Sequence, residues 1–158
     1  MNILFICTGN TCRSPMAQAL LEKMAEEKGL DIRVTSAGIF ALDGEEASHN
    51  AIEVLKAEGI DLSNHRARLL HRDLVEEADL ILTMSKSHKD AILSKYHFLE
   101  GKVFTLKEYA YGKEEDIADP FGGDLESYKR TKEEIKEALR QLTIDNEQLT
   151  IMVSLRDE

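Results

Sequence analysis

Short strand-like runs alternate along the sequence with segments of helical periodicity, and this alternation constrains the fold more than any other feature. The strand-like runs lie at residues 3–6, 32–37, 80–84 and 103–105. Helical patterns separate or follow them at residues 14–29, 48–59, 73–78, from residue 85, and at 127–142. Strands that alternate with helices form a parallel sheet covered by helices on both faces. The sequence therefore predicts a three-layer α/β fold that binds ligands beyond the carboxyl ends of its strands.

The chain length of 158 residues is typical of a single domain. We expect the domain to span residues 1–145 and residues 146–158 to form a C-terminal tail, whose structure the sequence does not indicate because it has no clear periodicity. Residues 106–123 contain three glycines, a proline and an acidic run, and they are predicted to form the longest loop. Loops of this length inside compact domains tend to be functional.

The charge balance argues against two classes of partner. The formal net charge is −10, from 20 Lys and Arg residues and 30 Asp and Glu residues. An acidic surface repels both nucleic-acid phosphates and anionic lipids. No apolar run reaches the roughly 18 residues of a transmembrane helix, and no basic segment precedes the apolar N-terminus as it would in a signal peptide. We therefore expect a cytoplasmic protein that binds neither nucleic acid nor membranes.

The segment CTGNTCRSP at residues 7–15 carries the strongest chemical signal. It joins a predicted strand to a helix N-terminus, where backbone N–H groups and the helix dipole bind anions. Cys7 would face that anion, in surroundings expected to lower the pKa of its thiol. Arg13 would bind two phosphate oxygens with its planar guanidinium, and Gly9 would permit a tight backbone path. This arrangement suits phosphoryl transfer to sulfur. The expected phosphate-binding residues are Thr8, Gly9, Asn10, Thr11, Cys12, Arg13 and Ser14.

Phosphoryl transfer to sulfur also needs a group that protonates the leaving group and later activates water. The predicted loop contains Asp119, followed by Pro120, Phe121 and two glycines. An Asp-Pro pair by itself is more often a plain turn. Because the segment at residues 7–15 contains no acid, Asp119 is the candidate general acid.

Together these two motifs resemble those of the low-molecular-weight protein tyrosine phosphatases, over about residues 1–145. The resemblance implies a four-stranded parallel sheet flanked by helices and a two-step reaction that needs no metal or other cofactor. It also implies that Cys7 attacks phosphorus and becomes a phosphocysteine, and that Arg13 stabilises the transition state. Asp119 would protonate the leaving group and then activate water. The substrates would be phosphorylated proteins, and the enzyme is expected to be a monomer.

Other residues resemble the supporting network of that family. Asn10 would hold the loop in shape, and Ser14 would donate a hydrogen bond to the sulfur of the nucleophile. Ser36 and His65 fall where the family places further partners of the loop; without the resemblance they would be a strand-end serine and a surface histidine. Cys12 resembles the family's second loop cysteine, which forms a disulfide with the nucleophile and protects it from over-oxidation. Packing within the loop is the alternative role for Cys12.

Two positions resemble the protein arginine phosphatase branch of the family. Tyrosine phosphatases usually carry a large aliphatic residue where this chain has Thr11, and they often place two aromatic residues after Asp-Pro, where this chain has Phe121 and Gly122. Thr11 would leave room for a phosphoguanidinium and hydrogen-bond to it. Asp119 would pair with the guanidinium, and Phe121 would stack on it. The branch also implies an opposing protein arginine kinase.

Three other functions compete with hydrolysis of phosphoarginine in proteins. A protein tyrosine phosphatase would use the same chemistry, with Thr11 as a neutral substitution. Arsenate reduction uses the same loop in related proteins, but its disulfide relay needs further cysteines, and Cys7 and Cys12 are the only two here. A non-catalytic phosphoprotein-binding module could dispense with Cys7 or Asp119, yet both are present. We therefore expect a protein arginine phosphatase, with phosphotyrosine as the main alternative substrate.

Overall fold

A computed structural model describes residues 1–144 of the chain, so the predicted tail at residues 146–158 lies outside the described residues. The described part contains the following elements in order: β1 (Asn2–Cys7), α1 (Arg13–Lys28), β2 (Arg33–Gly38), α2 (His49–Lys56), α3 (Arg72–Glu77), β3 (Leu80–Thr83), α4 (Lys86–Lys95), the 3₁₀ helix η1 (His97–Leu99), β4 (Val103–Thr105), α5 (Leu106–Tyr111) and α6 (Leu125–Ile144).

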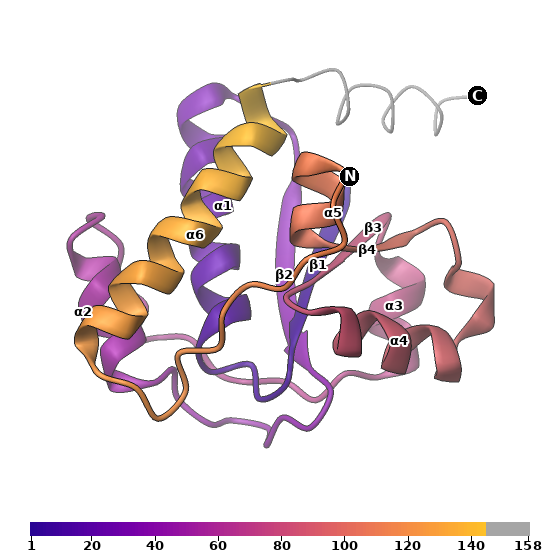
Figure 1. Cartoon of the computed structure of the whole chain (residues 1–158), viewed down its shortest axis with the longest axis horizontal. Coiled ribbons are helices and arrows are strands. Elements are labelled where there is room, and N and C mark those ends of the chain that lie inside the picture. The colour runs from indigo at the N-terminus through magenta and orange to yellow at the C-terminus, as the bar shows by residue number, and fades with distance from the viewer. Residues whose placement is uncertain (145–158) are drawn as a thin grey trace.

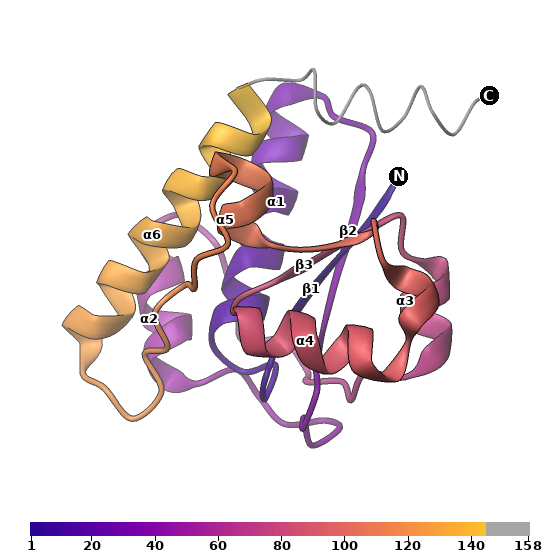
Figure 2. The ribbon, with the colours of Figure 1, turned by 45° about the vertical axis from the view of Figure 1, so that its right-hand side comes forward.

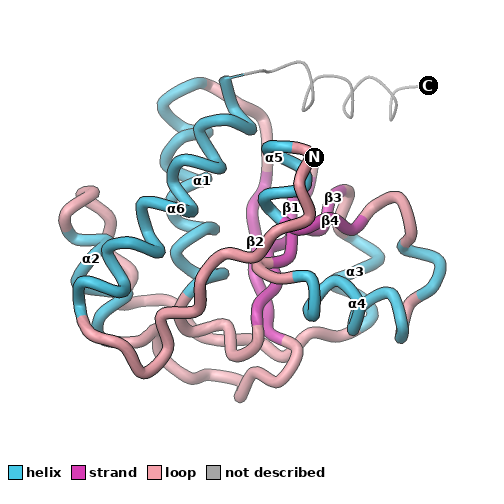
Figure 3. Tube along the Cα trace, in the orientation of Figure 1, coloured by secondary structure: helices cyan, strands magenta, loops and turns pink. Residues whose placement is uncertain are grey.

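The four strands form one parallel sheet in the order β2-β1-β3-β4 (Figure 1). Ile6 of β1 is in register with Ala37 of β2 on one side and with Thr83 of β3 on the other. The predicted parallel α/β sheet is therefore confirmed. Because the strands are parallel, their carboxyl ends share one edge, where the connecting loops gather at the lower side of Figure 3.

Helices cover both faces of the sheet (Figures 1 and 2). Alternate residues of β1 enter two separate hydrophobic clusters. Ile3, Phe5 and Cys7 lie in a cluster with residues of α1, α2, α5 and α6, whereas Leu4 and Ile6 lie in a cluster with residues of α3 and α4. The alternation places Cys7 on the same face of the sheet as α1, and α1 begins six residues later.

Most of the expected helix ends are confirmed. The hydroxyls of Ser48 and Ser85 accept hydrogen bonds from backbone N–H groups in the first turns of α2 and α4. Gly29 ends α1 in a left-handed conformation with a φ of 66°. Helix α1 begins at Arg13 rather than at residue 14, so Pro15, a residue type that suits the first helical position, is its third residue.

The predicted long loop at residues 106–123 is partly wrong, because Leu106–Tyr111 forms helix α5. A reciprocal capping box starts this helix: the Thr105 hydroxyl accepts from the Glu108 N–H at 3.0 Å, and the Glu108 carboxylate accepts from the Thr105 N–H at 3.2 Å. The remaining loop, between α5 and α6, carries Asp119 to the carboxyl edge of the sheet.

Candidate active site

A pocket of about 320 Å³ opens at the carboxyl end of β1. Nine residues line it: Cys7, Thr8, Gly9, Thr11, Cys12, Arg13, Glu45, Asp119 and Phe121. Eight of these were predicted from the sequence, and Glu45 is the addition. The structure thus brings the two motifs, more than 100 residues apart in sequence, to one pocket. The remaining predicted residues, Asn10, Ser14, Ser36 and His65, are not among those that line it.

Two hydrogen-bond donors face the buried sulfur of Cys7. The Ser14 Oγ lies 2.8 Å from the sulfur, and the Asn10 N–H donates to it at 3.2 Å. Because the Ser14 oxygen accepts a hydrogen bond from the Asn10 side-chain amide at 2.8 Å, its own hydrogen is available for the sulfur. Ser14 therefore takes the position that was predicted for it.

Burial raises the pKa of the Cys7 thiol, whereas the Ser14 hydroxyl, the N–H groups of Ser14 and Asn10, and the Arg13 guanidinium lower it. Burial is the largest of these influences. The expected lowering of this pKa is therefore wrong, because the argument from the loop sequence left out the transfer of the sulfur from water to the protein interior. The four opposing interactions each stabilise the thiolate, but they only partly offset the effect of burial.

Asn10 is the centre of the network behind the loop. It is fully buried and has a left-handed backbone conformation, with a φ of 57°. Its side-chain amide donates to Ser14 at 2.8 Å and to Ser36 at 2.9 Å, and its side-chain oxygen accepts from the Arg68 N–H at 3.0 Å. Its backbone carbonyl accepts from His65 Nε2 at 2.8 Å. The structure thus brings Asn10, Ser36 and His65 together as the resemblance implied.

The tight backbone path expected at Gly9 is found elsewhere. A Cβ atom added at Gly9 would meet only the Thr11 hydroxyl, at 3.7 Å, and the left-handed residue of the loop is Asn10. The close approach occurs at Gly38, where an added Cβ would lie 2.5 Å from the Thr8 carbonyl oxygen and 2.9 Å from the Asn10 nitrogen. The loop therefore requires a glycine at the end of the neighbouring strand β2.

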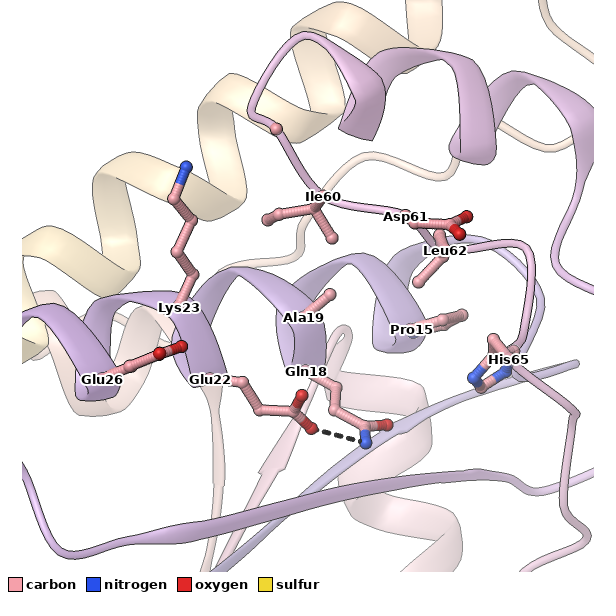
Figure 4. Close-up of a pocket in the computed structure, with 11 residues that line it drawn as sticks. Pro15, Gln18, Ala19, Glu22, Lys23, Glu26, Ile60, Asp61, Leu62 and His65 are labelled. Atoms are coloured by element: carbon pink, nitrogen blue, oxygen red, sulfur yellow. Dashed lines mark hydrogen bonds between the residues drawn. The ribbon is translucent and has the colours of Figure 1, made fainter.

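Gln18 extends the network to a second pocket behind the loop, of about 460 Å³ (Figure 4). The Ser36 hydroxyl, which accepts from Asn10, donates to Gln18 Oε1 at 2.6 Å, and the Gln18 amide donates to Glu22 on the next turn of α1. His65 also lines this pocket, at the end that contains Pro15. Burial lowers the pKa of His65, so the neutral ring that donates to Asn10 is favoured.

Arg13 and Asp119 face each other across the active-site pocket. The Arg13 guanidinium donates to the Ile117 carbonyl at 2.9 Å and forms an ion pair with Asp119 at 3.5 Å. The Arg13 side chain is 7% exposed and the Asp119 side chain is 54% exposed. Asp119 also accepts a hydrogen bond from the Phe121 N–H at 3.0 Å, which fixes the turn that holds both residues at the mouth of the pocket. The Arg13 cation is thus buried and fixed, and the candidate acid Asp119 is open to solvent.

Cys12 is a buried free thiol next to Tyr128 of α6. Its sulfur lies 3.2 Å from the Tyr128 hydroxyl, and it donates to the Ser48 hydroxyl at 3.5 Å. Burial, together with the Cys12 contact, raises the pKa of Tyr128 to about 12. Cys12 therefore packs the loop against Ser48 and α6, which agrees with the packing role predicted as one of its two alternatives.

His88 and Tyr128 contact the loop but were not predicted from the sequence. The His88 Nε2 lies 2.8 Å from the Thr8 hydroxyl, and its Nδ1 lies 2.8 Å from the Ser85 hydroxyl. Burial, reinforced by the Arg13 charge, lowers the pKa of His88 to about 4, so the ring is neutral at neutral pH. Both residues lie on helices that are far from the loop in the sequence, and no local pattern marks them.

The described residues contain neither a metal-binding cluster nor a membrane-spanning helix. Within residues 1–144, no group of three or more His, Cys, Asp or Glu side chains is placed to hold a metal ion. None of the helices in that range combines the length and the apolar character needed to cross a bilayer.

Comparison with known proteins gives one consistent result. The sequence model for "Low molecular weight phosphotyrosine protein phosphatase" matches residues 2–153. A protein-arginine-phosphatase from Bacillus subtilis is 49% identical over 142 residues, covering 90% of this chain and 94% of the relative. The low molecular weight protein-tyrosine-phosphatase PtpB from Staphylococcus haemolyticus is 38% identical, covering 85% of this chain and 92% of the relative. A solved structure of the YwlE arginine phosphatase, a C7S mutant with a phosphorylated active-site serine, superimposes with a TM-score of 0.91 at 45% identity, over 96% of this chain and 99% of that one.

Proposed function

Because the chain belongs to the low-molecular-weight phosphotyrosine protein phosphatase family, we propose that it is a cysteine-dependent protein arginine phosphatase. The observation that carries the choice of substrate is the 49% identity, over 90% of the chain, to a relative with that name. The pocket supports it, since Thr11, Asp119 and Phe121 all line the same pocket as Cys7. These are the side chains expected to hold a phosphoguanidinium.

In the first step, the Cys7 thiolate attacks phosphorus in line with the P–N bond. The S–P bond forms as the P–N bond breaks, and Asp119 gives its proton to the departing nitrogen. Arg13 and the loop N–H groups stabilise the charge on the equatorial oxygens. The distance of 3.5 Å between Arg13 and Asp119 places this carboxyl group beside the phosphate-binding groups.

In the second step, Asp119 accepts a proton from water, and the water oxygen attacks the phosphorus of phosphocysteine. The S–P bond breaks, and the electron pair returns to Cys7 as a thiolate. The hydrogen bond from Ser14, at 2.8 Å, stabilises that leaving group. The solved relative with a phosphorylated serine in place of its active-site cysteine supports the same position for the covalent intermediate.

The setting of this reaction is also part of the proposal. We expect a monomer in the cytoplasm that opposes a protein arginine kinase and binds neither nucleic acid nor membranes. The reaction needs a reduced nucleophile, and both described cysteines are free thiols, as is usual in a reducing compartment. Peroxide should inactivate the enzyme by forming a Cys7–Cys12 disulfide, which mass spectrometry of the oxidised protein detects. Sulfonate at Cys7 without that disulfide would contradict the protective role of Cys12.

The substrate is tested by kcat/KM for a phosphoarginine peptide and a matched phosphotyrosine peptide, using the wild type and Thr11→Ile. The wild type should prefer phosphoarginine, and the larger aliphatic side chain should reverse the preference. Preference for phosphotyrosine in both proteins would support the main alternative, which the similarity to PtpB also favours.

The nucleophile is tested separately with Cys7→Ser. This variant should bind inorganic phosphate but show no turnover, because the anion is held by Arg13 and the backbone. Measurable steady turnover in Cys7→Ser would contradict the mechanism, whichever substrate is preferred.

A further inference from the structure

Glu45 lines the active-site pocket, although it lies outside both motifs. It belongs to the segment that joins β2 to α2, and three backbone hydrogen bonds fix that segment, one of them to the loop. The Glu45 N–H donates to Leu42 at 3.2 Å, and its carbonyl accepts from Ala67 at 2.8 Å. The Ser48 N–H donates to the Thr11 carbonyl at 2.9 Å. The backbone of Glu45 is therefore fixed beside the wall of the pocket rather than on a free loop.

The charges in this pocket are unevenly paired. Arg13 and Asp119 form an ion pair with each other, which leaves Glu45 as the remaining charged residue of the lining. The structure of residues 1–144 shows no hydrogen bond or ion pair for the Glu45 carboxylate. The adjacent Glu46, by contrast, is outside the pocket lining and pairs with Arg66 at 3.7 Å.

An unpaired carboxylate at the mouth of a phosphate pocket repels a ligand that carries only negative charge. It attracts a ligand whose phosphoryl group has a positive charge beside it. We propose, on the basis of the proposed function, that Glu45 is a specificity-determining residue that selects substrates with a cation next to the phosphoryl group. That cation is either the guanidinium of phosphoarginine itself or a basic side chain that flanks the phosphorylated residue.

The test compares Glu45→Gln with the matched control Glu46→Gln on four peptides. Two carry phosphoarginine and two carry phosphotyrosine, and each pair has either neutral or lysine-containing flanks. Glu45→Gln should lower kcat/KM about two- to fivefold, the size of an exposed ion pair, for peptides with the relevant cation. It should not lower kcat/KM for phosphotyrosine with neutral flanks, and the loss should shrink as ionic strength rises.

The pattern of losses identifies the cation. A loss on phosphoarginine with neutral flanks supports the guanidinium as its source, and a loss confined to lysine-containing peptides supports the flanking side chain. Equal changes on all four peptides, or the same pattern in Glu46→Gln, would overturn the inference. A wild-type preference for phosphotyrosine would overturn the proposed substrate instead, and the two phosphotyrosine peptides would still test Glu45.

Discussion

Replacing Asn10 with alanine removes the side chain on which the shape of the loop depends. That side chain is fully buried and makes three hydrogen bonds, to Ser14, to Ser36 and from the Arg68 N–H. At about 1 kcal/mol net for each bond, their loss lowers the free energy of unfolding by about 3 kcal/mol. Alanine at a φ of 57° adds about 1 kcal/mol of backbone strain. The expected total is about 4 kcal/mol.

Asn10→Gly separates these two contributions, because glycine loses the same hydrogen bonds but adopts the left-handed conformation without strain. Urea unfolding of both variants and the wild type gives the free energies, provided that the dependence on urea is unchanged. Asn10→Gly should be about 1 kcal/mol more stable than Asn10→Ala. Both should lose activity, since Ser14 no longer receives the bond that directs its hydrogen toward Cys7.

Two results would refute this reasoning. A loss of less than about 1 kcal/mol in Asn10→Ala would show that the buried hydrogen bonds do not hold the loop. Equal stability of the alanine and glycine variants would show that the left-handed backbone at Asn10 carries no strain. Domains of this size have a total stability of about 5–15 kcal/mol, so Asn10→Ala should remain folded enough to measure.

Three other substitutions test separate parts of the site. Asp119→Ala should slow turnover about 10²- to 10⁴-fold on substrates with a poor leaving group; steady-state kinetics on poor and good leaving groups measure this, and an equal effect on both would remove Asp119 from the role of acid. Ser14→Ala removes an interaction that lowers the pKa of Cys7, so the pH midpoint for alkylation by iodoacetamide should rise; an unchanged midpoint would contradict the contact. Burial and Arg13 lower the folded-state pKa of His88 to about 4, so the unfolded chain binds the proton more tightly. Stability should therefore fall as pH is lowered from about 6.5 toward 4, and His88→Asn should lose this part of the pH dependence in urea unfolding; an unchanged profile would refute the argument.

The sheet could be predicted from the sequence because a short strand-like run of residues marks each strand. Runs at residues 3–6, 80–84 and 103–105 correspond to β1, β3 and β4 within a residue or so at each end. Several helix ends could also be predicted from local residues, because α2 and α4 begin after Ser48 and Ser85 and α1 ends before Gly29, as expected. Helix α5 was missed although its capping box, Thr105 and Glu108, is also present in the sequence. The acidic and glycine-containing residues that follow it outweighed that signal.

The residues of the active site also fall into two groups, those marked by the local sequence and those brought in by the fold. The residues of the loop itself were predicted because they are contiguous and form a motif. Glu45, His88 and Tyr128 were not, because each reaches the site through the fold. The contact of His88 with Thr8 spans 80 residues, and that of Tyr128 with Cys12 spans 116. Only the packing of α4 and α6 around the sheet determines which of their side chains meet the loop.

The mistaken role of Gly9 shows how the sheet completes the loop. Gly38 is in register with Cys7, because β1 and β2 are parallel neighbours and end together. The chain that leaves β2 then runs beside the loop, and the Phe40 N–H donates to the Thr8 carbonyl at 2.9 Å. A side chain at Gly38 would displace that carbonyl and the Asn10 nitrogen. The phosphate-binding shape is thus imposed by two adjacent strands and by the network behind the loop, in which the bonds of Asn10 to Ser14, Ser36, His65 and Arg68 do not involve the Cys7 side chain. Loss of the thiol should therefore abolish chemistry while anion binding persists.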